Sequence, residues 1–496
     1  MGWLNLRTST PDSATLHPVS APLSCNFAHH CYGAPMRRIL PLLIVVFGLA
    51  LFTAIPLSSA ALIGVQSDGE LVNSSRTPAL QAQVLDKMKA QGASVVRINF
   101  GWNEVSGDGC ATQTLTQLRD PNNTCYNWTL FDSLVSQATA RGIQVLASVS
   151  RTPRWVLGNT NPNYVGTRSS EWTRLVTNYE SFMGAAAQRY AAGSTYGTIK
   201  LWTVWNEPNS TYHFAPITTS IMRSAMPKRY AQMVGKTAVA IKTANPTALV
   251  SLGPTGPQST IKPIPYILAV QKVLPTFLPG SSITAKRHWV DAWSHNPYPG
   301  VTISPSRGKA TSPTVGMSNI RDLFTQLDAA PITKGMKVWA TEFAYQTNPP
   351  DKTLGISPAL QGRFMAESFD WLESTNRVTV LIWYGFTDAV DLADWQSGTY
   401  YSNGVAKPSL AWFQRPVSVP LAIVRRGTTA RVWARSNVNP SATRIAFSYD
   451  NKTWKLLPIM GRKSDGTTII NVRVMKTIYF ATWDGVRGPA RPVLAR

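Results

Sequence analysis

The sequence predicts an α/β chain, a (β/α)₈ TIM barrel that is followed by a small C-terminal all-β domain of the sandwich kind. Eight short apolar or β-branched runs alternate with amphipathic helical segments from residue 62 to 413. Successive runs begin 32 to 56 residues apart, which is too far for hairpins and enough for a helical crossover each time. After residue 413 the helical period disappears, and short alternating runs follow one another.

The eight predicted barrel strands are apolar, as expected for a parallel sheet that helices cover. They are expected at 62–66, 94–100, 143–149, 199–205, 248–253, 289–294, 336–341 and 378–383. Helices between them are expected at 79–91, 128–141, 171–191, 228–244 and 358–374. A doubly wound open sheet is the alternative fold, but no G-x-G-x-x-G follows the first strand, so the barrel is favoured.

The last part of the chain, residues 414–496, is predicted to be a basic β-sandwich-like domain. Strands are expected at 430–435, 444–449, 469–474 and 477–482, separated by Gly, Pro, Asn and Asp. This segment holds 15 Lys and Arg against 3 Asp and no Glu, a net charge of +12 (15 − 3) out of the +23 of the whole chain. Its charge indicates a polyanionic partner or a solvated surface that seals the flank of the barrel.

The composition excludes several classes of protein. With 17 Trp, 16 Tyr and 16 Phe the chain can bury a large core, which excludes wholesale disorder. Its 33 Gly and 35 Pro exclude a collagen-like fibre. The four Cys lack C-x-x-C spacing and the His are scattered, so we expect no metal site and no cofactor.

The first 61 residues are expected to be a leader. Met36 precedes two arginines, an apolar run at 39–57 and small residues at 58–61, which is the pattern of a secretory signal peptide. The apolar run is long enough for an uncleaved membrane anchor to be the alternative, and translation is expected to start at Met36. The protein is therefore expected to be secreted or associated with the cell envelope.

Export explains the two cysteines that flank a polar loop, Cys110 and Cys125. Outside the cytoplasm they are expected to form a disulfide worth about 3 kcal/mol in the loop-entropy model, with two unpaired thiols as the alternative.

Two carboxylates close apolar strands, at the edge where a parallel barrel places its active site. Glu207 lies in W-N-E-P-N at residues 205–209, and Glu342 follows the run at 336–341. Two carboxylates on one cleft rim are what glycoside hydrolysis needs, since one protonates the leaving oxygen and the other attacks the anomeric carbon or activates water. The alternative is that each Glu merely caps the next helix or pairs with an arginine.

Residues 204–209, together with Thr341-Glu342-Phe343, resemble the clan A glycoside hydrolases. Within the clan the chain most resembles the secreted bacterial enzymes of the cellulase-like family 5 and the xylosidase-like family 39. The resemblance covers residues 62 to about 413; the motif is specific for the clan and poorly specific for substrate. It implies that Glu207 is the general acid/base, that Glu342 is the nucleophile and that configuration is retained, with carboxyl groups about 5–5.5 Å apart.

The same resemblance assigns supporting roles to two polar side chains. Asn206 matches the clan residue that hydrogen-bonds the sugar 2-hydroxyl, a contact that strengthens as the oxocarbenium ion develops. Arg97 matches the clan arginine that holds the nucleophile in its ionised form. A surface ion pair is the alternative for Arg97, but its neighbours at 95, 96 and 98 are apolar.

Aromatic residues are expected around the first sugar subsite. Tyr298 matches a clan tyrosine whose hydroxyl lies near the nucleophile, whereas His295 is a weaker candidate, because alignment on Pro297 and Tyr298 puts Asn296 in the histidine's place. Trp383, at the end of strand eight, matches the tryptophan that forms the floor of the subsite, since flat rings suit the apolar faces of a pyranose. Three further tryptophans in loops on this side are candidates to extend the cleft or to pack at its rim: Trp102, Trp155 and Trp395.

The leading hypothesis is a secreted, monomeric, retaining glycoside hydrolase that acts on a β-linked polysaccharide or glycoconjugate. The alternative is a non-catalytic carbohydrate-binding protein of the cell envelope; the joint presence of Glu207, Asn206, Glu342 and Arg97 argues against it. Nucleic-acid binding rests on the charge alone and no recognised motif supports it, so no nucleic-acid partner is expected. The basic C-terminal domain is expected to bind an anionic envelope polymer, unless it only seals the barrel.

Overall fold

The computed structural model describes residues 61–496 except 74, 258, 460–461 and 464. The predicted signal peptide or anchor and the predicted start at Met36 lie outside the described residues. Within the described ranges, no helix combines the length and the apolarity needed to cross a bilayer.

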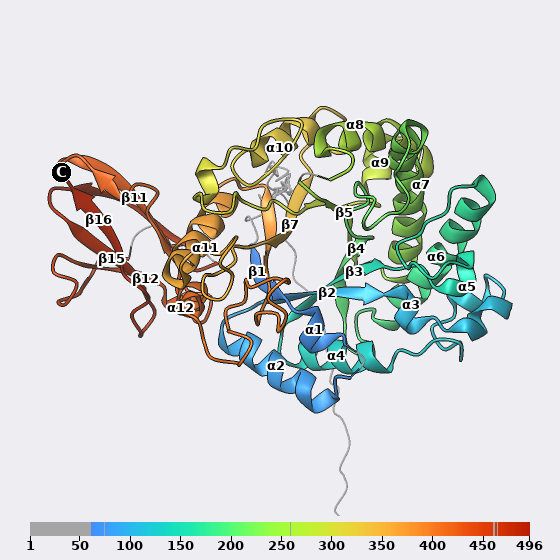
Figure 1. Cartoon of the computed structure of the whole chain (residues 1–496), viewed down its shortest axis with the longest axis horizontal. Coiled ribbons are helices and arrows are strands. Elements are labelled where there is room, and N and C mark those ends of the chain that lie inside the picture. Colours follow the sequence, from blue (N-terminus) through green and yellow to red (C-terminus); the bar gives the residue numbers. More distant parts are fainter. Residues whose placement is uncertain (1–60, 74, 258, 460–461, 464) are drawn as a thin grey trace, which may run out of the picture. The chain divides into compact units, whose positions relative to one another are not determined.

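Eight parallel strands close into a barrel in sequence order, β1 to β8, as predicted (Figure 1). The strands are β1 (Leu62–Gln66), β2 (Val95–Gly101), β3 (Gln144–Ser150), β4 (Ile199–Val204), β5 (Leu249–Thr255), β6 (Ala292–His295), β7 (Lys337–Phe343) and β8 (Val378–Tyr384). β1 pairs with both β2 and β8, which closes the sheet. The TIM-barrel prediction is confirmed.

Helices connect the strands and surround the barrel (Figure 1). They are α1 (Asp68–Leu71), α2 (Pro78–Ala90), α3 (Trp102–Val105), α4 (Thr129–Ala140), α5 (Arg154–Leu157), α6 (Ser169–Arg189), α7 (Ser220–Ala244), α8 (Pro263–Val273), α9 (Ile283–Arg287), α10 (Ile320–Asp328), α11 (Pro358–Glu373) and α12 (Pro408–Gln414). α7 begins eight residues before the predicted start at 228, because the Thr219 side chain caps it and Pro227 is accommodated inside it. Pro usually opens a helix, which is why the sequence misplaced this boundary.

The sixth strand is also displaced from its predicted range. Trp289 precedes β6 and donates its indole N–H to the carbonyl of Pro279, 3.1 Å away. The carboxylate of Asp291 accepts hydrogen bonds from the backbone N–H of Val250 and from Lys242 Nζ. The strand begins after these side chains, at Ala292, and runs one residue further than predicted, to His295.

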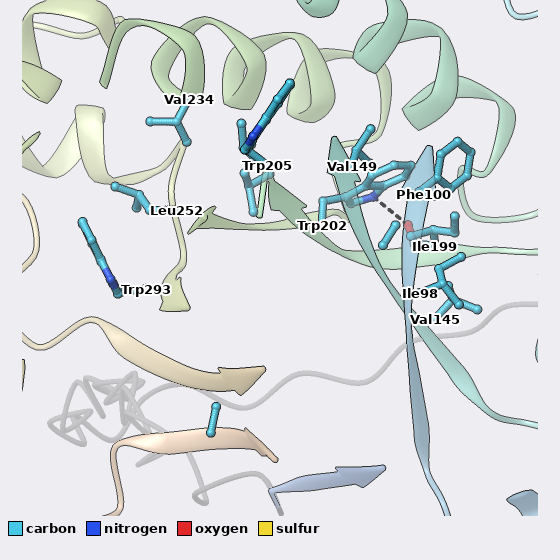
Figure 2. Close-up of a cluster of buried hydrophobic side chains, with 14 of the residues drawn as sticks. Ile98, Phe100, Val145, Val149, Ile199, Trp202, Trp205, Val234, Leu252 and Trp293 are labelled. Carbon is cyan, nitrogen blue, oxygen red and sulfur yellow. Dashed lines mark hydrogen bonds between the residues drawn. The ribbon is translucent and has the colours of Figure 1, made fainter. Parts of the chain in front are cut away.

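Side chains of the barrel strands alternate between its interior and the helices outside. Inside, the layer nearer the amino ends of the strands is apolar and includes Leu146, Leu201 and Trp339. Polar residues such as Ser148 and Thr203 follow it along the same faces of their strands. Outside, Ile98, Phe100, Val149 and Trp202 join the large core between sheet and helices (Figure 2). The interior therefore becomes polar toward the carboxyl ends of the strands.

After α12 the chain forms two antiparallel-rich sheets around a second apolar core, as the predicted all-β domain requires (Figure 1). One sheet has the order β10-β16-β15-β12-β13 and the other β14-β11-β9. The strands are β9 (Val417–Ser418), β10 (Ile423–Val424), β11 (Thr428–Ala434), β12 (Arg444–Ser448), β13 (Lys455–Leu456), β14 (Thr468–Val474), β15 (Ile478–Trp483) and β16 (Arg491–Ala495). The four predicted strands correspond to β11, β12, β14 and β15. The two-residue strands β9, β10 and β13 are too short for a sequence pattern, and β16 was missed although it is as long as β12.

Three arginines of these sheets form ion pairs with three acids on one face of α11. Arg431 pairs with Asp370 at 2.8 Å, Arg435 with Glu373 at 2.7 Å, and Arg491 with Glu367 at 3.1 Å. The acids recur every three residues and therefore face the same side of the helix.

In the pair of Arg435 with Glu373, both side chains are buried. Glu373 also accepts hydrogen bonds from Trp433 Nε1 and Thr467 Oγ1, and Arg435 also donates to the carbonyl of Ala61, at the foot of β1. Acids inside the protein therefore neutralise part of the positive charge of residues 414–496.

Apolar packing joins the same parts. Ala366 of α11 and Trp412 of α12 belong to the core of the C-terminal sheets. A Cβ at Gly362 would lie 2.2 Å from the Trp412 ring, so only glycine admits this contact. The C-terminal sheets thus pack against the outer face of α11.

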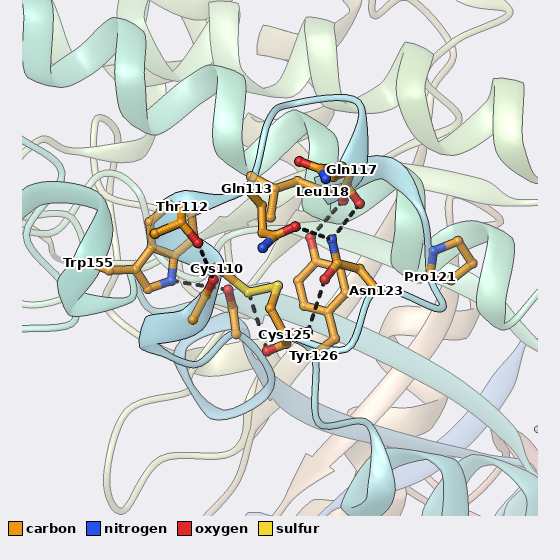
Figure 3. The surroundings of a disulfide bond; sticks show 12 residues. Cys110, Thr112, Gln113, Gln117, Leu118, Pro121, Asn123, Cys125, Tyr126 and Trp155 are labelled. Carbon is orange, nitrogen blue, oxygen red and sulfur yellow. Dashed lines mark hydrogen bonds between the residues drawn. A yellow bond between two sulfur atoms is a disulfide. The ribbon is translucent and has the colours of Figure 1, made fainter.

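A disulfide joins Cys110 and Cys125 across the loop between α3 and α4 (Figure 3). The loop is also held by the Tyr126 hydroxyl, which donates to the carbonyl of Leu118, and by Asn123 Nδ2, which donates to Gln117. Trp155 donates its indole N–H to Ser106 beside it. The disulfide therefore fixes a loop that lies next to the β2 and β3 ends of the barrel.

Replacing Arg435 by methionine should lower the free energy of unfolding by about 3–5 kcal/mol, because it leaves the buried Glu373 carboxylate without its cation. Urea unfolding followed by tryptophan fluorescence measures the change. The matched control is Arg119→Met, which breaks a surface pair with Glu180 and should cost less than about 1 kcal/mol. Equal losses in the two variants would contradict the role of Arg435.

Candidate active site

Glu342 lies at the end of β7, where the pairing of β7 with β8 shifts between Ala340 and Phe343. Such an irregularity re-aims side chains at the rim of a barrel. The Glu342 side chain accepts hydrogen bonds at both oxygens, from Arg97 Nη1 at 2.6 Å and from the Tyr298 hydroxyl at 3.0 Å. Burial raises the pKa of Tyr298 well above its usual range, so its hydroxyl stays protonated and donates.

Arg97 is fully buried inside the barrel and contacts both halves of the site. Its second terminal nitrogen donates to Asn206 Oδ1 at 2.9 Å and to Ser148 Oγ at 3.3 Å, and the first also contacts Gln66. Because Asn206 accepts through its oxygen, its NH₂ group is the donor left for a ligand. Arg97 does not line the cleft; it holds the residues that do.

Glu207 lies two residues after Trp205 in the turn that follows β4. Trp205 and Glu207 have φ angles of 70° and 40°, a left-handed backbone that non-glycine residues rarely adopt. A Cβ at Gly256 would lie 2.5 Å from Glu207 Oε2, so the β5 loop approaches the carboxyl group closely because residue 256 is glycine. Strain and close packing of this kind are typical of functional sites.

The Glu207 carboxyl group has an environment unlike that of Glu342. Its Oε1 accepts a hydrogen bond from Asn296 Nδ2 at 2.8 Å, and its Oε2 lies 3.9 Å from His213 Nε2. Burial, and next the negative charge of Glu342, raise the pKa of Glu207 to about 7. A carboxyl group with this pKa can give and take a proton near neutral pH.

The two carboxyl groups line one cleft of about 480 Å³ at the carboxyl ends of the strands. Asn206, His213 and Arg151 line it as well. Three aromatic rings form part of its wall, with Trp395 5.1 Å from both Tyr298 and Tyr384 between ring centroids. The cleft therefore combines acid–base groups with flat apolar surfaces, which suits a sugar ring.

Two residues predicted at this cleft lie elsewhere, and strand alternation is the reason. His295 faces outward from β6 and is fully buried; its Nδ1 contacts Thr255 Oγ1 and its Nε2 the carbonyl of Val315. Asn296, the next residue, reaches Glu207 instead. Trp383 likewise faces the helices from β8 and donates to the Ser397 carbonyl, so Tyr384 takes the place expected for it.

Of the three rim tryptophans, only Trp395 lines the cleft. Trp102 is buried and Trp155 is partly buried, and the two rings pack against each other with centroids 6.3 Å apart. They belong to the packing beneath the loop that the disulfide holds.

His213 was not among the predicted site residues. Burial lowers its pKa to about 4, so it is neutral near pH 7. Trp205 donates its indole N–H to the carbonyl of His213 at 2.6 Å, which ties this loop to the W-N-E-P-N motif. Only its position six residues after Glu207 could have drawn attention to it, and a lone histidine in a loop is a weak signal.

In the described part of the chain, no group of three or more His, Cys, Asp or Glu is placed to hold a metal ion. The arrangement itself can protonate an oxygen through Glu207 and present an anion through Glu342. These are the two operations of acid-assisted nucleophilic substitution at an acetal carbon.

Comparison with known proteins agrees with this geometry. Residues 62–383 match the family model described as cellulase (glycosyl hydrolase family 5). No curated protein sequence matches the chain.

Two solved structures of glycosidases are similar to this chain. A glucosidase from Croceicoccus marinus is 14% identical with a TM-score of 0.52, over 87% of this chain and 82% of that one. A monomeric β-xylosidase from Caulobacter crescentus is 16% identical with a TM-score of 0.49, over 84% of this chain and 94% of that one. The first likeness shows the fold, and the family model confirms the resemblance that residues 204–209 carry. The chain therefore belongs to the cellulase family, glycosyl hydrolase family 5, and is a glycoside hydrolase.

Proposed function

We propose that this glycoside hydrolase cleaves its substrate by double displacement with retention of configuration. The observation that carries the proposal is the contrast between the two carboxyl groups of the cleft. Glu342 pairs with a buried arginine and accepts from a neutral tyrosine, whereas Glu207 has a pKa raised to about 7. This contrast favours Glu342 as the nucleophile and Glu207 as the general acid/base.

In the first step, the Glu342 carboxylate attacks the anomeric carbon while Glu207 gives its proton to the glycosidic oxygen. The bond between the anomeric carbon and that oxygen breaks, the aglycone leaves as an alcohol, and a glycosyl ester forms on Glu342. Arg97 and the Tyr298 hydroxyl orient the attacking oxygens, and the NH₂ group of Asn206 is placed to donate to the sugar.

In the second step, Glu207 takes a proton from water, which attacks the same carbon and releases Glu342. Esterification has removed the negative charge of Glu342 that helped to raise the pKa of Glu207. Glu207 is therefore a stronger acid in the intermediate and is present as the base that this step requires. Two inversions give net retention.

We propose that the substrate is a β-linked polysaccharide or glycoconjugate and that the protein acts outside the cytoplasm as a monomer. The aromatic wall of the cleft supports a sugar chain as ligand. The disulfide between Cys110 and Cys125 supports an oxidising compartment, and the basic and apolar pattern at residues 36–61 supports export.

We also propose that the C-terminal sheets bind an anionic polymer of the cell envelope. Of the fifteen Lys and Arg after residue 413, four form ion pairs in the described residues: Arg415, Arg431, Arg435 and Arg491. The other eleven have no acidic partner among the described residues. Removing the whole segment would expose the acids of α11, so individual cations have to be changed to test the binding.

Glu207→Ala should lower kcat about 10²–10⁴-fold on substrates with a poor leaving group, because proton donation is lost. Azide should restore turnover of an activated aryl glycoside and give a glycosyl azide of unchanged configuration, since this leaving group needs no acid. Glu342→Gln should nearly abolish turnover on both kinds of substrate. Wild-type rates in both variants would contradict the assignment of the two carboxyl groups.

Early ¹H NMR spectra of the reaction should show a first product with the anomeric configuration of the substrate. Spectra must be recorded before mutarotation mixes the anomers. An inverted first product would make Glu342 a base for water rather than a nucleophile.

The alkaline limb of the kcat/KM profile should fall near pH 7, where free Glu207 loses its proton. The hydrogen bond from Asn296 favours the ionised carboxylate and so lowers the pKa of Glu207. Asn296→Ala should therefore move the alkaline limb to higher pH. Asn163→Ala, which alters a cleft residue that makes no hydrogen bond to Glu207 in the described structure, should leave the limb in place. An unchanged or lowered limb in Asn296→Ala would refute this coupling.

A further inference from the structure

One face of the five-stranded C-terminal sheet carries aromatic residues at regular positions. Ala446 of β12 is paired with Leu456 of β13 and with Ala481 of β15, so these three side chains share a face. Trp454 lies two residues before Leu456, and Tyr479 and Trp483 lie two residues on either side of Ala481. Because side chains alternate along a strand, Tyr479 and Trp483 of β15 belong to this face. Trp454 precedes β13 and adjoins the same face through Arg487, whose guanidinium lies over its ring and whose backbone bridges to Trp483.

The three rings are partly exposed and belong to none of the buried cores. Small residues, Ala446 and Ala481, separate them. From strand geometry, Tyr479 and Trp483 stand about 13 Å apart along β15, and Trp454 lies two strands, about 10 Å, away from that strand. The face therefore offers separate flat surfaces over a length that fits several sugar rings.

Cations accompany the rings. The Arg487 guanidinium lies over the Trp454 ring, 4.7 Å from its centroid, and the backbone of Arg487 bridges to Trp483. Stacking of this kind leaves the N–H groups of the guanidinium free to meet an anion. Arg444, paired with Trp483 across the sheet, adds a second positive charge beside the ring.

The three acids of this segment, Asp450, Asp465 and Asp484, form no ion pair with Arg487 or Arg444 in the described residues. Asp484 is buried against Arg415 and Ser436. Asp450 accepts from the backbone N–H groups of Lys452 and Thr453 and so fixes the turn between β12 and β13. In the described residues, Arg487 has no acid within ion-pair distance.

We propose that this face is a second carbohydrate site, separate from the catalytic cleft, which binds an anionic polysaccharide. Trp454, Tyr479 and Trp483 stack on sugar rings, and Arg487 and Arg444 meet their carboxylate or sulfate groups. The inference deepens the proposed binding of the C-terminal sheets to an anionic polymer by naming the residues and the chemistry. Its test involves no turnover, so failure of the catalytic proposal would not affect the result.

Binding of the full chain to immobilised polygalacturonate is measured by biolayer interferometry at low salt and at about 0.15 M salt. Trp454→Ala/Trp483→Ala should weaken binding about tenfold at both salt concentrations, although it leaves the net charge unchanged. Arg487→Gln should weaken it severalfold. The matched control is Arg473→Gln, which removes one exposed arginine from β14 in the other sheet and should have a smaller effect.

Neutral hydroxyethyl cellulose serves as the second ligand and should bind at least about tenfold more weakly than polygalacturonate. If the two Arg variants lose binding equally and the double Trp variant binds like wild type, diffuse charge explains the retention and the site is wrong. Equal binding to the neutral polymer would overturn the anionic ligand. If the double Trp variant unfolds at a lower temperature than the wild type, the comparison of Arg487→Gln with Arg473→Gln tests the site instead. Both side chains are exposed, so neither substitution disturbs the core.

Discussion

The buried guanidinium of Arg97 is the contact on which the geometry of the site depends. It lies inside a closed barrel with no exposed surface and yet donates to groups from β1, β3, β7 and the turn after β4. A buried cation must be paired with an anion and hydrogen-bonded to be tolerated, and Glu342 supplies the anion. The requirement to satisfy Arg97 therefore places both Glu342, which attacks the anomeric carbon in the proposed mechanism, and Asn206, whose NH₂ group donates to the sugar in it.

The raised pKa of the second carboxyl group, Glu207, depends on the absence of a paired arginine. Glu207 faces an amide and a neutral histidine and, among the described residues, has no ion-pair partner as close as Arg97 is to Glu342. Burial and the charge of Glu342 therefore raise its pKa more than the Asn296 hydrogen bond and the charge of Arg97 lower it. Thr341 donates to Asn296 Oδ1 at 2.8 Å, which orients the Asn296 NH₂ group toward Glu207. The Thr341 hydroxyl on β7, the strand of Glu342, thus orients the hydrogen bond to Glu207, and Asn296 couples the two carboxyl groups.

The sequence predicted the barrel, its strand count and the two carboxyl groups, because these rest on patterns of many residues or on a motif that is specific for the clan. The sequence-based prediction failed where it had to choose which of two neighbouring residues faces the cleft. His295 and Asn296, like Trp383 and Tyr384, are neighbours, and a strand places neighbours on opposite faces. Apolar strands that are buried on both sides show no alternation that would reveal which neighbour faces the cleft. The Glu342 position involves a shift of pairing at the end of β7, which no periodicity encodes. His213 reaches the site from a loop, where spacing carries no information about distance.

Net charge also proved an incomplete guide to the C-terminal segment. The arginines that pair with α11 and with Asp484 contribute to the formal +12 but meet acids inside the protein, where they join the sheets to the barrel. A polymer would contact only the lysines and arginines that form no ion pair. The same number of such cations could be spread evenly over the surface or concentrated beside aromatic rings. Arg487 over Trp454 shows that at least one cation lies against an aromatic surface. A cation that is held in this way loses less conformational freedom on binding than a solvated lysine, so position rather than number determines what this segment can recognise.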